Sequence, residues 1–312
     1  MKAMNFDRPI YSVDGMELRQ IECFLACDEH RSFTAAARAL NLVQSAVSTS
    51  VAKLERELGA RLFDRTPHAL VLTEAGRAML DPARSMLRAR RDVVDAIDAA
   101  RGQVRGEVVI GNLMNVYTLD LAGVIADIHR RHPEVTLQMR QSISGVGGNV
   151  AGLRDGSLDI ALLAGTATEL PGITLYPISA ENLVLCTAPD HPLAGRPFRA
   201  ADLDGVRFVD FAPGWGVRGI ADTLFPARHP VIEVADQFFA LELVAKDFGV
   251  TLVPRSVAER ASGIVCAESA GAPIPWNLVI AHDAQRTPSN AARTFIDAVS
   301  PAARTRRSAR RP

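Results

Sequence analysis

The sequence predicts an α/β multidomain protein with a helical N-terminal unit that ends in a small wing, one linker helix, and a C-terminal region of two α/β subdomains. Three observations predict this fold. Residues 18–58 carry apolar side chains at helical spacing in three short runs. Residues 74–100 carry one longer helical pattern. After Glu107, short apolar strands alternate with helical runs, which is typical of βαβ units in a sheet.

The N-terminal pattern is that of a helix-turn-helix motif over residues 33–52. A first helix is predicted from Leu18 to His30, and a second begins after Ser32, a residue type that caps helix N-termini. Asn41 tolerates the left-handed conformation of a tight turn, and a third helix follows from Gln44. Two helices joined by a short turn can place one helix in the DNA major groove.

Polar side chains on the outer face of the third helix are candidates for DNA contact. Glutamine can bond an adenine edge in two places, serine and threonine can bond a base or a phosphate, and lysine neutralises phosphate charge. Residues 62–63 and 70–72 predict the two strands of the wing, with Arg65 between them as a backbone clamp. The DNA-binding candidates are Thr34, Gln44, Ser45, Ser48, Thr49, Lys53 and Arg65. Each such residue alone is as often merely solvated, so the prediction depends on the whole pattern.

Net charge gives no support to a purely electrostatic DNA binder. The chain has 35 Lys and Arg against 35 Asp and Glu, and Met16 to Gly76 has seven basic residues against eight acidic ones. DNA binding would then depend on where the charges point and on two copies acting together. The Arg-rich tail, residues 301–312, is predicted to be a disordered solubilising segment, with a supplementary DNA or partner contact as the alternative.

The helix predicted over residues 74–100 carries apolar residues at intervals of seven, which is the pattern of a coiled-coil dimer. The predicted dimer seam consists of Leu80, Leu87, Val94 and Ile97. Arg90 interrupts this seam and would fix its register, and Pro82 should bend the helix. The alternative is an amphipathic helix that packs only on its own chain.

Residues 105–300 predict two α/β subdomains with a cleft between them, the first made of 105–178 and 274–300 and the second of 179–273. Ligands in such folds lie beyond the carboxyl ends of the strands, where helix N-termini favour anions. The predicted effector-binding residues are Asn115, Ser144, Gly145, Trp215, Arg218 and Phe238. Arg218 is the expected partner of a carboxylate on the ligand, and its alternative role is a surface ion pair. For Trp215, the alternative is a place in the hydrophobic core.

No catalytic or metal site is expected. The sequence has no nucleophile elbow, no phosphate-binding glycine loop and no His-Glu-x-x-His motif. Its four cysteines lack the spacing of a disulfide framework or a zinc site. Cys23 and Cys27 lie one helical turn apart, and packing in the small core is favoured over a metal or redox pair. No cofactor is expected.

Motifs along the chain resemble the LysR-type transcriptional regulators. They include Leu18-Arg19-Gln20-Ile21, Gln44-Ser45-Ala46-Val47-Ser48, Leu62-Phe63-Asp64-Arg65, Leu72-Thr73-Glu74-Ala75-Gly76 and Gly249-Val250-Thr251-Leu252-Val253-Pro254. The resemblance implies a winged helix-turn-helix over 16–73, a dimerisation helix over 74–104, and an effector-binding domain over 105–300 that is similar to periplasmic binding proteins. Thr49 and His68 depart from the family's usual arginines, so the operator sequence cannot be borrowed from relatives.

The predicted function is a cytoplasmic, homo-oligomeric transcriptional regulator that binds specific DNA and is modulated by a small anionic co-inducer in the cleft. Its expected partners are double-stranded DNA, the effector, a second copy of the chain and RNA polymerase. No interaction with a membrane is expected. The resemblance alone implies a tetramer. Residues 1–15 carry no signal-peptide pattern and are expected to be an extension. The alternatives are a ligand-independent architectural DNA-binding protein and an α/β enzyme with an accessory winged-helix domain.

Overall fold

The computed structural model describes residues 16–66, 69–113, 116–142, 145–166 and 169–300. The N-terminal extension, the Arg-rich tail, His68 and the two predicted site residues Asn115 and Ser144 lie outside these ranges. The chain divides into two compact units, Met1–Val94 and Asp95–Pro312. Within the described ranges, no helix is apolar over enough of its length to cross a membrane.

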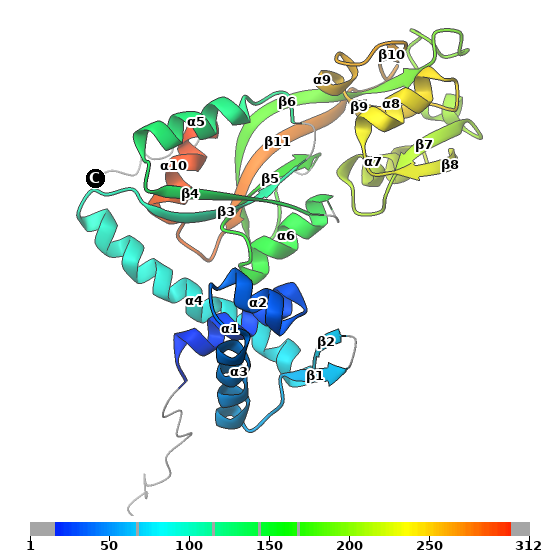
Figure 1. Cartoon of the computed structure of the whole chain (residues 1–312). Helices are drawn as coiled ribbons and strands as arrows, with labels where there is room; N and C mark the ends of the chain where they lie inside the picture. The colour runs from blue at the N-terminus through cyan, green and yellow to red at the C-terminus, as the bar shows by residue number, and fades with distance from the viewer. Residues whose placement is uncertain (1–15, 67–68, 114–115, 143–144, 167–168, 301–312) are drawn as a thin grey trace, which may run out of the picture. The chain divides into compact units, whose positions relative to one another are not determined.

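The first unit contains the three predicted helices, α1 (Leu18–His30), α2 (Phe33–Ala39) and α3 (Gln44–Leu58) (Figure 1). The hydroxyl of Ser32 accepts a hydrogen bond from the backbone N–H of Ala35 at 3.3 Å, which confirms the predicted cap. Asn41 has a φ of 54°, so the left-handed turn is confirmed as well. The apolar faces of the three helices meet in one core that includes Ile21, Phe24, Ala36, Ala37, Val47, Val51 and Leu54.

The wing is a two-stranded antiparallel ribbon of β1 (Phe63–Thr66) and β2 (Ala69–Leu72). Helix α4 (Glu74–Ala100) follows it, and the Thr73 hydroxyl caps this helix by accepting the N–H of Gly76 at 3.0 Å. Gly76 has to be a glycine, because a Cβ atom there would collide with the backbone carbonyl oxygen of Leu62. The start of α4 is therefore fixed tightly against the wing.

The predicted dimer seam divides into two parts along α4, which continues through Pro82. Leu80 and Leu87 are partly buried and pack against the core of the helix-turn-helix in the same chain, and their place in a dimer seam stays a prediction. Val94 and Ile97 are each 51% exposed, and the neighbouring Val93 is 66% exposed. The C-terminal part of the seam thus has the more exposed apolar side chains.

The second unit is built on a seven-stranded mixed sheet with the strand order β10-β6-β11-β5-β3-β4, in which β9 also pairs with β6. Strand β3 runs parallel to β4 and β5, whereas β11 is antiparallel to β5 and β6. The strands are β3 (Gly106–Asn112), β4 (Val135–Gln141), β5 (Ile160–Gly165), β6 (Ile173–Thr187), β9 (Thr251–Pro254), β10 (Val265–Ala267) and β11 (Ile274–Asp283).

Helices cover both faces of the part of the sheet formed by β3, β4 and β5 (Figure 1). Helices α5 (Leu121–Arg131) and α10 (Asn290–Val299) pack on one face, where Phe295 and Ile128 are buried. Helix α6 (Gly145–Asp155) packs on the other face through Leu153. The βαβ series predicted for this region is therefore confirmed.

Strand β6 is longer than the sequence indicates. The expected strand Leu183–Cys186 is only the end of a 15-residue strand, and the expected subdomain boundary after residue 178 falls inside it. The first half of β6 was not predicted as a strand because it contains Pro177, and proline is rare in central strands. In the structure, Pro177 lies where the register between β6 and β11 shifts. Strands β6 and β11 thus run continuously between the two subdomains.

The second subdomain adds the parallel pair β7 (Arg207–Phe211) and β8 (His229–Val234). This pair is a separate two-stranded sheet, and β7 is held beside the start of β9 by a hydrogen bond of 2.8 Å from the N–H of Val209 to the carbonyl of Val250. A Cβ on Gly249 would lie 2.7 Å from the carbonyl oxygen of Arg207, so this close approach requires glycine. The remaining elements are η1 (Ala200–Leu203), α7 (Gly216–Leu224), α8 (Gln237–Ala245) and α9 (Arg255–Ala258).

Candidate DNA-binding face and ligand cavity

The outer face of α3 carries the polar side chains that the sequence analysis singled out. Val47 on the inner side of the helix is fully buried. Arg65 lies in β1, where its register partner is Leu70. Of the other predicted DNA-binding residues, Ser48 and Lys53 are half-buried, and Thr34, Gln44, Ser45 and Thr49 are exposed. The α3 residues therefore lie where a groove could reach them, and their contact with DNA stays a prediction.

Lys53 is paired with carboxylates in the DNA-free chain. Its Nζ atom lies 2.8 Å from an Oε1 of Glu17 and 3.9 Å from an Oε1 of Glu57. The hydrogen bond and the charge of Glu17 raise the pKa of Lys53, so the side chain stays cationic. A phosphate group would have to compete with Glu17 for this ammonium group.

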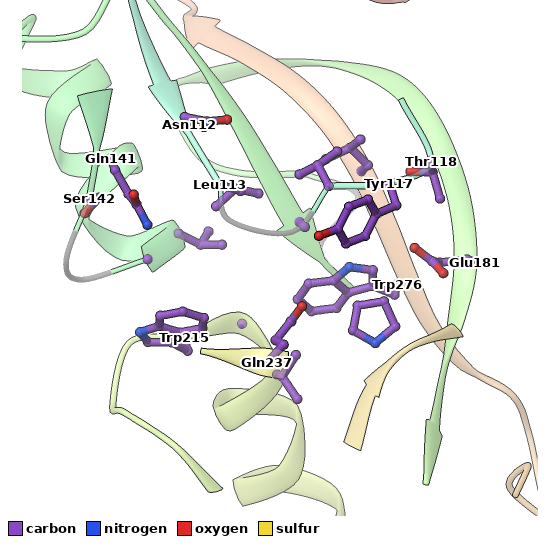
Figure 2. A pocket seen from close by; sticks show the side chains of 18 residues that line it. Asn112, Leu113, Tyr117, Thr118, Gln141, Ser142, Glu181, Trp215, Gln237 and Trp276 are labelled. Carbon is purple, nitrogen blue, oxygen red and sulfur yellow. The ribbon is translucent and has the colours of Figure 1, made fainter. Parts of the chain in front are cut away.

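A cavity lies in the second unit, where strands end and helices begin (Figure 2). Strands β3 and β4 reach it through their last residues, Asn112 and Gln141. Helices α6, α7 and α8 reach it through their first residues, Gly145, Gly216 and Gln237. Backbone N–H groups at helix N-termini favour electronegative ligand atoms.

Aromatic side chains form the walls of the cavity. Figure 2 shows Trp215 on one side and Trp276 with Tyr117 on the other. Trp215 stacks on Phe211 with a centroid distance of 5.7 Å and an interplanar angle of 13°. Phe238 was expected in the lining. Its ring packs edge to face on the ring of Tyr117, with 5.9 Å between the ring centroids, and so holds this lining residue in place. These packed rings fix the shape of the walls.

Two buried amide oxygens stand out among the polar groups of the lining. The Oε1 atom of Gln237, whose residue is 5% exposed, and the Oδ1 atom of Asn112 are buried without a hydrogen-bond partner among the described residues. The carboxylate of Glu181 accepts the N–H of Ser256 at 2.7 Å and its hydroxyl at 2.9 Å. None of the described lining residues is a lysine or an arginine. A ligand that donates hydrogen bonds would satisfy the two amide oxygens.

Arg218 is not part of this lining. Its guanidinium group donates to Asp222 at 2.9 Å and to Glu233 at 2.6 Å, and it also donates to the carbonyl of Phe211. The hydrogen bond to Glu233 raises the pKa of Arg218. The structure shows Arg218 in ion pairs, which is the alternative role that the sequence allowed. We therefore leave Arg218 out of the proposed ligand site.

Of the predicted effector-binding residues that the structure describes, Gly145 and Trp215 line the cavity. Three lining residues that were not predicted from the sequence come from a loop and from β6 and β11: Tyr117, Glu181 and Trp276. A signal for Glu181 was present, because it is the one charged residue of β6. Trp276 carried no such signal, because an aromatic residue in a strand is more often part of the core.

Comparisons with known proteins agree with this architecture. Residues 18–77 match the family model "Bacterial regulatory helix-turn-helix protein, lysR family", and residues 101–304 match "LysR substrate binding domain". The transcriptional regulator ShiR of Corynebacterium glutamicum is 38% identical over 205 residues, which cover 63% of this chain and 64% of ShiR.

Two solved structures of full-length proteins are similar over most of the chain. A full-length OxyR variant from Pseudomonas aeruginosa superposes with a TM-score of 0.72 at 21% identity, covering 91% of this chain and 94% of OxyR. CbnR, solved in complex with its target DNA, gives a TM-score of 0.60 at 25% identity and covers 91% of this chain and 98% of CbnR. With both family models matched in the expected order, the chain belongs to the LysR family of transcriptional regulators.

Proposed function

We propose that this protein is a transcriptional regulator without enzymatic activity, which binds operator DNA through α3 and responds to a small molecule in the cavity. The observation that carries the proposal is the cavity with three helix N-termini and aromatic walls, in a chain that also presents an exposed recognition helix. The similarity to CbnR, which was solved with its target DNA, supports the DNA-binding role. Such a regulator would act in the cytoplasm, where bacterial DNA lies.

The DNA-binding role can be tested with fluorescence anisotropy of the full chain on genomic fragments and random duplexes. Gln44→Ala should weaken binding to a preferred fragment by about 1–3 kcal/mol, because a bidentate base contact is lost, and should leave binding to random duplex unchanged. Gln103→Ala, at an exposed position of the second unit, is the matched control. The proposal fails if the wild type prefers no genomic fragment.

Glu17→Gln should strengthen DNA binding irrespective of sequence. The substitution releases the Lys53 ammonium group from its ion pair and makes it available to a phosphate. The plot of log affinity against log salt concentration should steepen by about one unit, as for one additional phosphate contact. Glu29→Gln removes an equal charge from the exposed end of α1 and is the control. Equal effects of both substitutions would assign the change to net charge alone.

The cavity favours a flat, small ligand that both donates and accepts hydrogen bonds. Trp215, Trp276 and Tyr117 provide apolar faces for a ring, and Gln237 and Asn112 provide acceptors. The helix N-termini favour a carboxylate or another electronegative group, even though no described lining residue is a basic one. We therefore propose a hydroxylated or amino-substituted ring that carries a carboxylate or another electronegative group.

Gln237→Leu should separate ligand binding from stability. Leucine fills a similar volume and removes a buried carbonyl oxygen that lacks a partner, so the melting temperature of the free protein should stay equal or rise. Affinity for a ligand that donates a hydrogen bond should fall by about 2- to 10-fold. Both tryptophans of the chain line the cavity, so their fluorescence reports the binding directly. Gln285→Leu, at an exposed loop position, is the control.

The two rival functions predict different outcomes in the same ligand screen. We propose that a bound ligand stabilises one arrangement of the two subdomains and thereby alters how the dimer engages DNA, which requires unequal affinity for the two arrangements. A ligand that quenches tryptophan fluorescence should then change the DNA footprint. An architectural DNA-binding protein would show the same footprint with every ligand, and an enzyme would convert the bound compound.

A further inference from the structure

Two cysteines face each other across neighbouring strands of the second subdomain. Cys186 near the end of β6 is the direct register partner of Cys266 in the edge strand β10. Their Sγ atoms lie 4.0 Å apart. Directly opposed residues of an antiparallel pair have Cβ atoms about 4.5–5.5 Å apart, close to the roughly 3.5–4.5 Å that a disulfide requires. A modest rotation of both side chains would bring the two sulfur atoms into bonding distance.

The two thiols differ in access and in charge. Cys186 is fully buried, whereas Cys266 is partly exposed. The hydrogen bond between the two thiols lowers the pKa of Cys266 to about 7; the nearby charge of Arg255 acts in the same direction, while partial burial and Glu259 oppose it. The same hydrogen bond, together with burial, raises the pKa of Cys186. The accessible sulfur is thus the better nucleophile, and the buried sulfur remains a protonated thiol beside it.

We propose that Cys186 and Cys266 form a redox-modification site, at which a small peroxide oxidises Cys266 and the product is an intramolecular disulfide with Cys186. Cys23 and Cys27 do not take part, because both are fully buried in the helix-turn-helix core. This inference goes beyond the proposed function and does not depend on a ligand in the cavity.

The reaction balances with the peroxide as its only oxidant. The Cys266 thiolate attacks the O–O bond; an S–O bond forms, the O–O bond breaks, and the leaving hydroxide or alkoxide takes up a proton. The sulfur of Cys186 then attacks the resulting sulfenic acid; the S–S bond forms, the S–O bond breaks, and the released hydroxide combines with the thiol proton to give water. Two thiols and one peroxide therefore yield one disulfide, one water and one alcohol or second water.

The position of the pair determines how lasting the bond would be. Facing strand positions hold their Cβ atoms at or beyond the usual disulfide spacing, and such bonds are more easily reduced than relaxed ones. Cellular thiols should accordingly reverse the modification. The bond would tie the three-residue strand β10 to β6, the strand that also contributes Glu181 to the cavity wall.

The test uses the reduced full chain treated with a small molar excess of hydrogen peroxide. The count of free thiols should fall from four to two, and peptide mapping without reductant should recover one species that links Cys186 to Cys266 within a single chain. Cys23 and Cys27 serve as internal controls and should remain free to alkylate after unfolding. Dithiothreitol should restore all four thiols.

Two variants identify the order of the steps. Cys186→Ala should leave Cys266 as a sulfenic acid that dimedone traps, whereas Cys266→Ser should leave Cys186 reduced at the same peroxide concentration. Should Cys186→Ala fail to fold because the residue is buried, the wild-type peptide map decides alone. The proposal is overturned if Cys266 stays reduced, if it oxidises only to the sulfinic acid, or if the disulfide joins two chains.

Discussion

Arg228→Met should lower the free energy of unfolding of the second unit by about 3–5 kcal/mol. The side chains of Arg228 and Asp210 are only 3% and 1% exposed, and the guanidinium Nε and Nη2 atoms donate to Asp210 Oδ2 at 2.9 and 2.6 Å. Without Arg228, the buried carboxylate of Asp210 would retain two interactions: the guanidinium group of Arg218 at 3.6 Å and a hydrogen bond from the N–H of Phe211. Both tryptophans of the chain lie in this unit, so their fluorescence in a urea titration measures its unfolding alone.

Two further variants show whether an orphaned charge causes the loss. Arg207→Met removes the same charge from an exposed position at the start of β7 and should change stability by at most about 0.5 kcal/mol. The double variant Arg228→Met/Asp210→Asn also removes the buried charge that has lost its main partner, and it should be more stable than Arg228→Met alone. If Arg228→Met were no more destabilising than Arg207→Met, the ion pair would contribute nothing beyond surface charge.

The helix-turn-helix could be predicted nearly to the residue because its determinants are local. Helical spacing placed Ile21 and Val51 inside, Ser32 predicted a helix start, and Asn41 predicted a left-handed turn, and each signal lies within a few residues of the feature that it specifies. The same holds for the helix N-termini at the cavity, because strand-to-helix order alone placed Gly145 and Trp215 near a shared edge.

The remaining features depend on pairings between distant segments. Arg218 was expected to bind a ligand. Its partner Asp222 lies one helical turn away, so sequence spacing could indicate that pair, but its second partner Glu233 comes from a strand 15 residues away, which no local pattern reveals. Cys186 and Cys266 are 80 residues apart and meet only through the register of β6 and β10. Strand β6 was predicted at less than half its length, because Pro177 is locally unfavourable for a strand. Pairing with the distant strand β11 stabilises β6 despite this proline.

The double substitution Val94→Glu/Ile97→Glu should separate the dimer and weaken binding to a two-site operator by about 10²- to 10⁴-fold. Both side chains are 51% exposed in the single chain, so their replacement costs little stability, but a carboxylate cannot be buried in an apolar coiled-coil seam without a partner. Loss of the dimer removes the high effective concentration at which the second helix-turn-helix meets its half-site. Analytical ultracentrifugation and fluorescence anisotropy measure the two effects separately.

Ala96→Glu is the matched control, because Ala96 is exposed on the same helix and takes a solvent-facing position when Val94 and Ile97 occupy the seam. It should remain dimeric and bind the operator like the wild type. On a duplex with a single half-site, the double variant and the wild type should bind equally well, since α3 is unchanged. A double variant that stayed dimeric would place the dimer contact elsewhere. The C-terminal part of α4 would then have to bury its apolar face against another surface of the assembly, because Leu80 and Leu87 already pack within their own unit.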